Sequence, residues 1–329
     1  MPKRVKIGMI GTGHGHARGK MSVLRASDDY EVVGLAEPDE GQRARNAETE
    51  PFKGVPLMTV EQLLNQPGLQ AVAVEGRVHE LLPAARACID AHKHVHLDKP
   101  PGDSLETFRG LLDDVDRKHL VLQMGYMFRY NPGFNLLRKL LADGVLGDAY
   151  QCTGVMSKVI TAARRQPLGR FSGGLMFELG CHLIDILVVM MGTPKKITPF
   201  LRHDAAIDDG LADNTLAVFE FDRAYATIES SAMEVSGFAR RQFVLCGSHG
   251  VYDLRPLESP EVRMALDAPR AGYREGYQPV EVPDYNRYVA DFIDLARCIR
   301  GEKAPDYTTQ HDLIVQRAVL QACGMPIDS

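Results

Sequence analysis

Two sets of residues in this 329-residue chain have the types and spacing that chemistry requires. The first is Lys99, which follows the apolar run His94–Leu97. That run predicts a strand of a parallel sheet, and open α/β sheets bind their ligands at the carboxyl ends of strands. The second set is Glu178, His182 and Asp185, whose spacing predicts that they share one face of a helix. The sequence therefore offers an ammonium group at a sheet edge and an imidazole between two carboxylates.

These groups suit the transfer of a hydride from a secondary alcohol. The alcohol must also lose its hydroxyl proton, and a neutral imidazole accepts protons near neutral pH. We therefore expect His182 to accept the proton, with Glu178 orienting its ring. Lys99 would donate a hydrogen bond to the same oxygen and stabilise its developing negative charge. Two plainer interpretations stay open: Lys99 as a solvated charge at a strand end, and His182 as a core histidine satisfied by Asp185.

A glycine-rich turn follows the first predicted strand. Glycines in such a turn let the backbone approach a pyrophosphate, whose charge then lies at a helix N-terminus. The third position of the GxGxxG pattern is occupied by His16 instead of a small residue. A turn that only joins strand to helix is the alternative. The residues that we expect to contact a dinucleotide here are Gly11, Thr12, Gly13, His14, Gly15 and His16.

The expected cofactor is NAD. Glu37 stands at the end of the second predicted strand, where a carboxylate binds both ribose hydroxyls and repels a 2'-phosphate. Arg43 and Arg45 lie nearby in the sequence and favour NADP, because an arginine there can bind its 2'-phosphate. We expect no metal, although two sets of residues have permissive spacings. One is the helix face just described, and the other is His92, His94, His96 and Asp98 along an extended strand.

The first part of the chain alternates short apolar runs with helical patterns, which is typical of βαβ units around a parallel sheet. The expected strands are 5–10, 31–36, 71–74, 94–97 and 121–125, and the expected helices are 17–26, 41–48, 60–65 and 81–91. These elements predict an α/β Rossmann domain over residues 1–123.

The remaining residues, 124–329, predict an α+β domain built on a mainly antiparallel open sheet. Period-two alternation marks the strands, and a helical pattern precedes and follows them. Residues 256–283 are interpreted as irregular surface structure. The expected strands are 214–221, 225–232, 242–246 and 251–254, and the expected helices are 134–143, 285–300 and 309–323.

The composition is that of an ordinary soluble globular protein, with 45% hydrophobic and 25% charged residues and a net charge of -5. A basic footprint for nucleic acid is missing, and the apolar stretch 186–191 is too short to span a bilayer. The six cysteines form no CxxC pair, which favours reduced thiols and a cytoplasmic location. Because the first predicted strand begins at Val5, we expect no signal peptide.

Several motifs in order carry a family resemblance. They are Ile10-Gly11-Thr12-Gly13, His94-Val95 leading to Lys99-Pro100, Gly125 to Pro132, Gly144-Val145-Leu146-Gly147, Gly173-Gly174, Glu178 to Asp185, Asp213-Asn214-Thr215 and Gly247-Ser248-His249-Gly250. Through them the chain resembles the Gfo/Idh/MocA oxidoreductases, which include glucose-fructose oxidoreductase and inositol dehydrogenase.

The resemblance implies a Rossmann domain that binds NAD or NADP and a second domain whose open sheet makes a homodimer or homotetramer. A cleft between the domains would hold the substrate. Lys99 takes the place of the lysine of the family's EKP motif, and with Pro100 it is expected to contact the cofactor. Glu178 and His182 fall on the family's helix Asp and His. The resemblance also implies a cis Lys99-Pro100 bond. Three residues depart from the family pattern: Asp98 for glutamate, Glu178 for aspartate, and His16.

The leading hypothesis is an NAD-dependent dehydrogenase that acts on a secondary hydroxyl of a sugar, polyol or sugar acid. Three arginines in the segment 164–170 suggest an anionic substrate, although a solvated loop explains them equally well. Two alternatives are a glycoside-cleaving enzyme that recycles its bound cofactor and a dinucleotide-binding regulator without turnover. The residues expected to contact substrate are Lys99, Tyr126, Arg129, Asn131, Arg165, His182 and Asp185.

Overall fold

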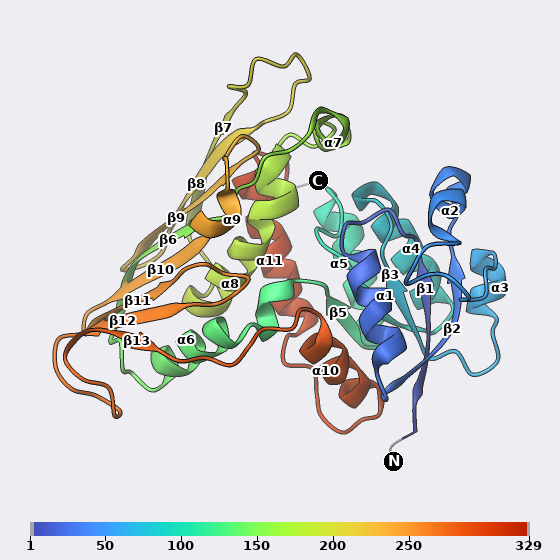
Figure 1. Ribbon diagram of the computed structural model, residues 1–329, viewed down its shortest axis with the longest axis horizontal. Coiled ribbons are helices and arrows are strands. Elements are labelled where there is room, and N and C mark those ends of the chain that lie inside the picture. The colour runs from blue at the N-terminus through green and yellow to red at the C-terminus, as the bar shows by residue number, and fades with distance from the viewer. Residues whose placement is uncertain (1–2, 328–329) are drawn as a thin grey trace. The chain divides into compact units, whose positions relative to one another are not determined.

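The computed structural model describes residues 3–327 and divides them into two compact units (Figure 1). The first unit comprises the chain up to Met127 together with Asn286–Leu313. The second comprises Phe128–Tyr285 together with the chain from Ile314 onward. This division differs from the predicted boundary between residues 123 and 124, because a C-terminal segment returns to the first unit.

The first unit contains a five-stranded parallel sheet in the order β2-β1-β3-β4-β5. This order confirms the predicted Rossmann architecture. The strands are β1 (Val5–Ile10), β2 (Tyr30–Ala36), β3 (Ala71–Val74), β4 (His94–Leu97) and β5 (Leu122–Met124). The helices are α1 (Ala17–Ala26), α2 (Glu40–Asn46), α3 (Val60–Leu64), α4 (Val78–Asp90), α5 (Leu105–Arg117) and α10 (Val289–Ile299).

Helix α5 is absent from the predicted elements, although its sequence carries the signals of a helix. Ser104 caps its N-terminus by accepting a hydrogen bond from the amide of Thr107, which satisfies one of the free donors of the first turn. Its buried residues recur at helical spacing: Leu105, Phe108, Leu111, Leu112 and Val115. This apolar stripe lies on one face, as in an amphipathic helix that packs on a sheet.

The second unit is built on an eight-stranded sheet in the order β13-β12-β11-β10-β6-β9-β8-β7. Only β6 and β9 pair in parallel, so the predicted mainly antiparallel sheet is confirmed. The strands are β6 (Ala149–Val155), β7 (Lys196–Arg202), β8 (Asn214–Glu220), β9 (Tyr225–Ser231), β10 (Gln242–Gly247), β11 (Gly250–Leu254), β12 (Val262–Leu266) and β13 (Gly276–Val280). The interpretation of residues 256–283 as irregular was wrong, since β12 and β13 extend the sheet there.

The remaining elements include one of unusual geometry. A π-helical turn (η2, Met176–Gly180) leads directly into α8 (Cys181–Met191). The others are the 3-10 turn η1 (Met127–Tyr130), α6 (Pro132–Ala142), α7 (Ala162–Leu168), α9 (Gly237–Arg240) and α11 (Thr309–Ala322). Helices α6 and α8 lie on the same side of the large sheet (Figure 1).

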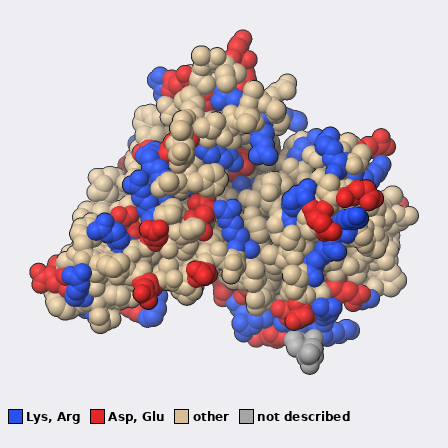
Figure 2. Space-filling model, viewed as in Figure 1, with Lys and Arg blue, Asp and Glu red and all other residues tan. Residues whose placement is uncertain are grey.

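The two faces of the large sheet differ in exposure. Along β8 and β9, every second residue is buried, including Phe219 and Ile228. The residues of the opposite face are half-exposed, and Phe200 and Tyr277 on that face are 50% and 55% exposed. Charged side chains of both signs lie close together on the visible surface of each unit (Figure 2). Among the described residues, no helix combines the length and apolar character needed to cross a membrane.

Candidate active-site residues in the two units

The glycine-rich turn is tightly packed on one side and open on the other. Gly11 has φ +83°, and a Cβ there would lie 2.6 Å from the backbone of Gly76, so only glycine fits. A Cβ on Gly13 would lie 3.2 Å from the amide nitrogen of Arg77. A Cβ on Gly15, in contrast, would meet no atom within 4 Å. The turn therefore leaves space for a phosphate group beside the N-terminus of α1.

Glu37 lies at the carboxyl end of β2, as predicted for a ribose-binding carboxylate. Its Oε2 accepts hydrogen bonds of 2.6 Å from both the amide and the hydroxyl of Thr12, and its Oε1 accepts one of 3.0 Å from the amide of Asp39. The side chain thus fixes the glycine-rich turn to the end of β2. Carboxylate oxygens accept more than one hydrogen bond each, so these contacts leave capacity for ribose hydroxyls.

Asp98 is the residue on which the turn and the end of β4 converge. Its Oδ2 lies 2.6 Å from Nδ1 of His14, and its Oδ1 lies 3.2 Å from Nδ1 of His16. Oδ1 also accepts a 2.7 Å hydrogen bond from the amide of Lys99. Asp98 is fully buried and Lys99 is 1% exposed. One carboxylate therefore contacts both the turn and the residue predicted to be catalytic.

A buried lysine and a second acid complete this group. Nζ of Lys20, on α1, lies 2.8 Å from Oε1 of Glu75 and 3.1 Å from Oδ2 of Asp98. All three side chains are fully buried. Lys20 and Glu75 are not among the predicted site residues. Their signal was a charged residue on the apolar face of α1, beside Ala17 and Met21, and an acid directly after the apolar strand β3.

Burial and charge set the ionisation of this cluster. Burial raises the pKa of Glu75 well above its usual range, and the nearby Asp98 carboxylate adds to that rise. Burial opposes ionisation of Asp98 too, but His14, Lys20 and His16 outweigh it and hold its pKa well below normal. The pKa of Lys20 is raised because the two carboxylates outweigh the loss of solvation.

Two buried histidines of this unit, His16 and His96, are held neutral at pH 7. Burial lowers the pKa of His16 to about 3, and burial likewise lowers that of His96 to about 3. His96 is engaged with β5 through a 2.9 Å contact between Nδ1 and Oε1 of Gln123. His94 accepts a 2.9 Å hydrogen bond from the amide of Val121. Although His14, His16 and Asp98 lie close together, the Lys20 ammonium already provides a cation there, and we assign no metal to them.

Glu178 and His182 lie in the second unit. The π-helical turn carries Glu178, and His182 follows in the first turn of α8. Oε2 of Glu178 lies 3.6 Å from Nζ of Lys158, which comes just after β6. His182 is 1% exposed, and its ring lies 5.8 Å from the ring of Phe128. π-helical turns inside helices occur frequently at functional sites, and this one reorients Glu178 relative to a regular helix.

Three predicted substrate residues have defined structural partners. Nε of Arg129 lies 3.1 Å from both carboxylate oxygens of Asp185, and its Nη2 lies 2.6 Å from Oδ1. Asn131 caps α6 by accepting hydrogen bonds from the amides of Gly133 and Phe134. Tyr126, in the first unit, is 2% exposed. The ion pair and the cap account for the burial of Arg129, Asp185 and Asn131.

Arg165 belongs to a second buried ion-pair group. It lies on α7 and is 1% exposed. Its Nη2 lies 3.1 Å from Oδ1 of Asp209 and 2.7 Å from Oδ2 of Asp213. The segment 164–170 is therefore largely helical and fastened by Arg165, and this arginine differs from the free loop cation that the sequence suggested.

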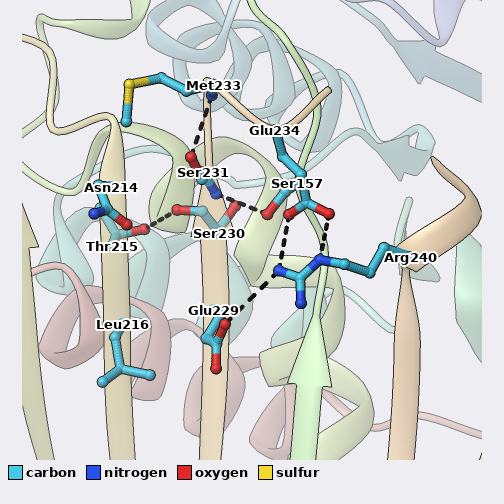
Figure 3. Close-up of a pocket in the computed structure, with 10 residues that line it drawn as sticks. All are labelled: Ser157, Asn214, Thr215, Leu216, Glu229, Ser230, Ser231, Met233, Glu234 and Arg240. Carbon is cyan, nitrogen blue, oxygen red and sulfur yellow. Dashed lines mark hydrogen bonds and ion pairs between the residues drawn. The ribbon is translucent and has the colours of Figure 1, made fainter. Parts of the chain in front are cut away.

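A pocket of about 430 Å³ lies in the second unit (Figure 3). Its hydroxyl groups have partners: the Thr215 hydroxyl donates to the Ser230 carbonyl, and that of Ser230 lies 2.8 Å from the carbonyl oxygen of Met156. The guanidinium of Arg240 is held by Glu234. None of the described lining residues is a predicted site residue.

The sequence of both units matches one family. Residues 5–126 match the oxidoreductase family with an NAD-binding Rossmann fold, and residues 134–253 match the GFO/IDH/MocA C-terminal domain. The chain belongs to the GFO/IDH/MocA oxidoreductase family. It is accordingly an NAD(P)-binding Rossmann protein with the C-terminal domain of that family.

Curated relatives act on several small molecules. The scyllo-inositol 2-dehydrogenase (NADP(+)) IolW of Bacillus subtilis (strain 168) is 24% identical over 305 residues, which are 90% of this chain and 79% of IolW. The glucose-6-phosphate 3-dehydrogenase of the same organism is 29% identical over 189 residues, 55% of this chain and 52% of that enzyme.

Solved structures share the whole fold at low identity. A putative NADPH-dependent oxidoreductase from Desulfitobacterium hafniense superposes with a TM-score of 0.84 at 15% identity, covering 98% of this chain and 96% of its own. UDP-N-acetylglucosamine 3-dehydrogenase GnnA from Acidithiobacillus ferrooxidans has a TM-score of 0.80 at 17% identity, covering 97% of each chain. These likenesses concern the fold.

Proposed function

We propose that this family member is an NAD-dependent oxidoreductase that transfers a hydride between nicotinamide and a secondary hydroxyl of a sugar, polyol or sugar acid. One observation carries the proposal. The buried carboxylate of Asp98 binds both the glycine-rich turn and the amide of Lys99, so the expected cofactor cradle and the expected catalytic cation form one structure. The inositol and hexose phosphate named for two relatives support an alcohol of this class.

The residues of the first unit fit a dinucleotide. The open side of Gly15 and the N-terminus of α1 suit its pyrophosphate. We assign the ribose hydroxyls to Glu37, and we favour NAD because this carboxylate would repel a 2'-phosphate. When bound, the nicotinamide supplies the acceptor for the hydride. Lys99 and Pro100, at the end of β4, are the further residues that we expect to contact the cofactor.

Each proposed catalytic residue has one task. The Lys99 ammonium donates a hydrogen bond to the substrate oxygen and stabilises its negative charge. A ring nitrogen of His182 accepts the proton of the substrate hydroxyl. Glu178 positions the side chain of Lys158, because its carboxylate lies 3.6 Å from the Lys158 ammonium. We assign Arg129, Asn131, Arg165 and Asp185 to folding of the second unit, since they hold one another or nearby groups.

The exposed face of the large sheet suits contact with a second copy of this chain. Phe200 on β7 and Tyr277 on β13, the two edge strands, expose half or more of their surface on this face, as does Tyr225 on β9 between them. Several large exposed side chains on one sheet face support an interface. We propose a homo-oligomer that buries this face. Phe200→Glu is expected to shift the protein to monomers in analytical ultracentrifugation, and Val235→Glu, on an exposed loop residue outside the strands, is the matched control.

The test is turnover with NAD and a panel of polyols, aldoses and sugar acids, followed by the absorbance of reduced nicotinamide. We expect a signal with at least one class of alcohol and a rate about 10²- to 10³-fold lower with Lys99→Met, whose NADH affinity should persist. The Lys6→Met variant, on the surface of the same unit, is the control for loss of a lysine. If the protein bound NADH but produced no absorbance change with any alcohol of the panel, the proposal of a net dehydrogenase would be contradicted.

A further inference from the structure

The most densely charged buried region of the first unit is not used by the hydride chemistry itself. Lys20 is 0% exposed, although lysine is almost never fully buried unless it is paired. Its ammonium lies between two buried carboxylates, those of Glu75 and Asp98, at 2.8 and 3.1 Å.

We propose that Lys20 is a positioning residue of the proposed active site: through Asp98 it holds the glycine-rich turn and Lys99 in one fixed arrangement. This inference rests on the proposed function for its effect on turnover, but its effect on cofactor binding is independent of turnover. Lys20 acts through another residue and is not itself assigned to contact substrate.

The geometry gives Asp98 four partners on three segments. Two come from the turn, His14 and His16, and one is the amide of Lys99. The fourth is Lys20, from the middle of α1. A carboxylate binds so many donors only while it is ionised. Protonation of Asp98 would remove an acceptor from the turn and from the end of β4 together.

Together with His14 and His16, the ammonium keeps this buried carboxylate ionised. Two carboxylates that share one site raise each other's pKa, whereas an adjacent cation lowers it. Gly125, after β5, provides the space, because a Cβ there would lie 2.8 Å from Nζ of Lys20.

The groups that face this cluster come from every neighbouring segment. They are His14 and His16 in the turn, Lys20 on α1, Glu75 after β3, His96 on β4, Lys99 after β4, and Tyr288 before α10, whose ring centre lies 5.7 Å from Nζ of Lys20. Tyr288 has its pKa raised to about 12 by burial, and so it stays neutral between pH 5 and 9.

The experiment measures NADH affinity against pH for wild type and Lys20→Met, by fluorescence titration or calorimetry. In the variant the pKa of Asp98 should rise, because the carboxylate loses an adjacent ammonium. We therefore expect the ratio of the dissociation constant of the variant to that of wild type to grow as the pH is lowered from 8 to 5.5. A packing defect alone would change affinity by a factor that does not depend on pH, and a constant ratio would overturn the inference.

Two further variants separate charge placement from folding. Arg300→Met removes another ion pair of the same unit, with Asp29 at 2.8 Å, and should leave the affinity ratio flat with pH. The double variant Lys20→Met/Glu75→Leu also removes Glu75, which the single variant leaves buried without the Lys20 ammonium. It therefore still tests the inference if the single variant fails to fold. If Lys20 served only Glu75, this double variant would bind like wild type, which would also overturn the inference.

Turnover provides a second, separable readout. For Lys20→Met at pH 7 we expect kcat to fall about tenfold or more while KM for the alcohol changes little, because misplacement of Lys99 costs transition-state stabilisation. If wild type turned over no alcohol, the proposed function would fail, yet the pH dependence of NADH binding would still decide the role of Lys20.

Discussion

The two units bury charge in different ways. In the first unit, the cluster around Asp98 combines carboxylates with a lysine and histidines, whose charges can change with pH. In the second unit, the buried carboxylates of Asp185 and Asp213 are paired with arginines, at 2.6 and 2.7 Å. A guanidinium remains protonated in proteins. The second unit therefore pairs its buried acids with permanently charged partners, whereas the first surrounds Asp98 with a lysine and two imidazoles.

The histidines show the same contrast. Burial lowers the pKa of His16 and of His96 in the first unit. In the second unit, a hydrogen bond to the carbonyl of Leu211 raises the pKa of His203, and Asp213 adds to the rise. We infer that arginine–carboxylate pairs hold the second unit together, and that the cluster around Asp98 belongs to the proposed cofactor-binding region.

The largest expected effect breaks an arginine–carboxylate pair. Arg129→Met leaves Asp185 as a buried carboxylate without its partner, which should lower the free energy of unfolding by about 3–5 kcal/mol. Denaturant unfolding measures this change. The double variant Arg129→Met/Asp185→Leu should recover most of the loss, and a single variant as stable as wild type would mean that the pair is unimportant.

The next effect concerns the reactive cation of the first unit. Lys99→Met should lower turnover by about 10²- to 10³-fold, since one donor to a developing oxyanion is lost. Its unfolding free energy should change far less than that of Arg129→Met, and NADH affinity should persist. Activity equal to wild type would remove Lys99 from the mechanism.

Arg165 offers a smaller change that sharpens the comparison. Arg165→Met removes hydrogen bonds to Asp209 and Asp213 and should destabilise the second unit by about 1–3 kcal/mol. Hydrogen exchange of α7 should accelerate, because this helix is fastened by that side chain. If the exchange of α7 stayed slow while KM for an anionic substrate rose, Arg165 would be a substrate residue after all.

Acidification should weaken the two units differently. His16 and His96 have folded pKa values of about 3, below their unfolded value, so their contribution to stability is complete above about pH 6.5. It decreases by at most about 1.4 kcal/mol per pH unit for each residue as the pH falls toward 3.

The pKa shift of His203 has the opposite sign to those of His16 and His96. Its folded pKa is raised, so its contribution is present below about pH 6.5 and is lost as the pH rises through the folded value. Hydrogen exchange at pH 7 and pH 5 should therefore show the first unit losing protection before the second. Equal losses in both units would contradict the contrast.

The sequence predicted individual strands, helices and turns better than it predicted which of them come together in the fold. Strands β1, β3 and β4 and helix α1 have the predicted bounds, because apolar runs and turn signals are local. The short strands β12 and β13 were missed, since each is defined by its neighbour in the sheet.

The site shows the same division. Glycine spacing identified Gly11, whose φ is positive, and the cis Lys99-Pro100 bond implied by the resemblance is present. The partnership of Lys20 with Glu75 joins residues 55 positions apart. No local pattern specifies it, because the parallel sheet alone brings the end of β3 under α1.

Hydride transfer to the nicotinamide is the central claim, and isotope transfer tests it most directly. The protein is incubated with NAD and alcohols that carry deuterium at the carbinol carbon, and the cofactor is then released and analysed by mass spectrometry. We predict deuterium in the nicotinamide ring with wild type, and labelling about 10²- to 10³-fold slower with Lys99→Met. Unlabelled cofactor after incubation with every alcohol of the panel would contradict the account.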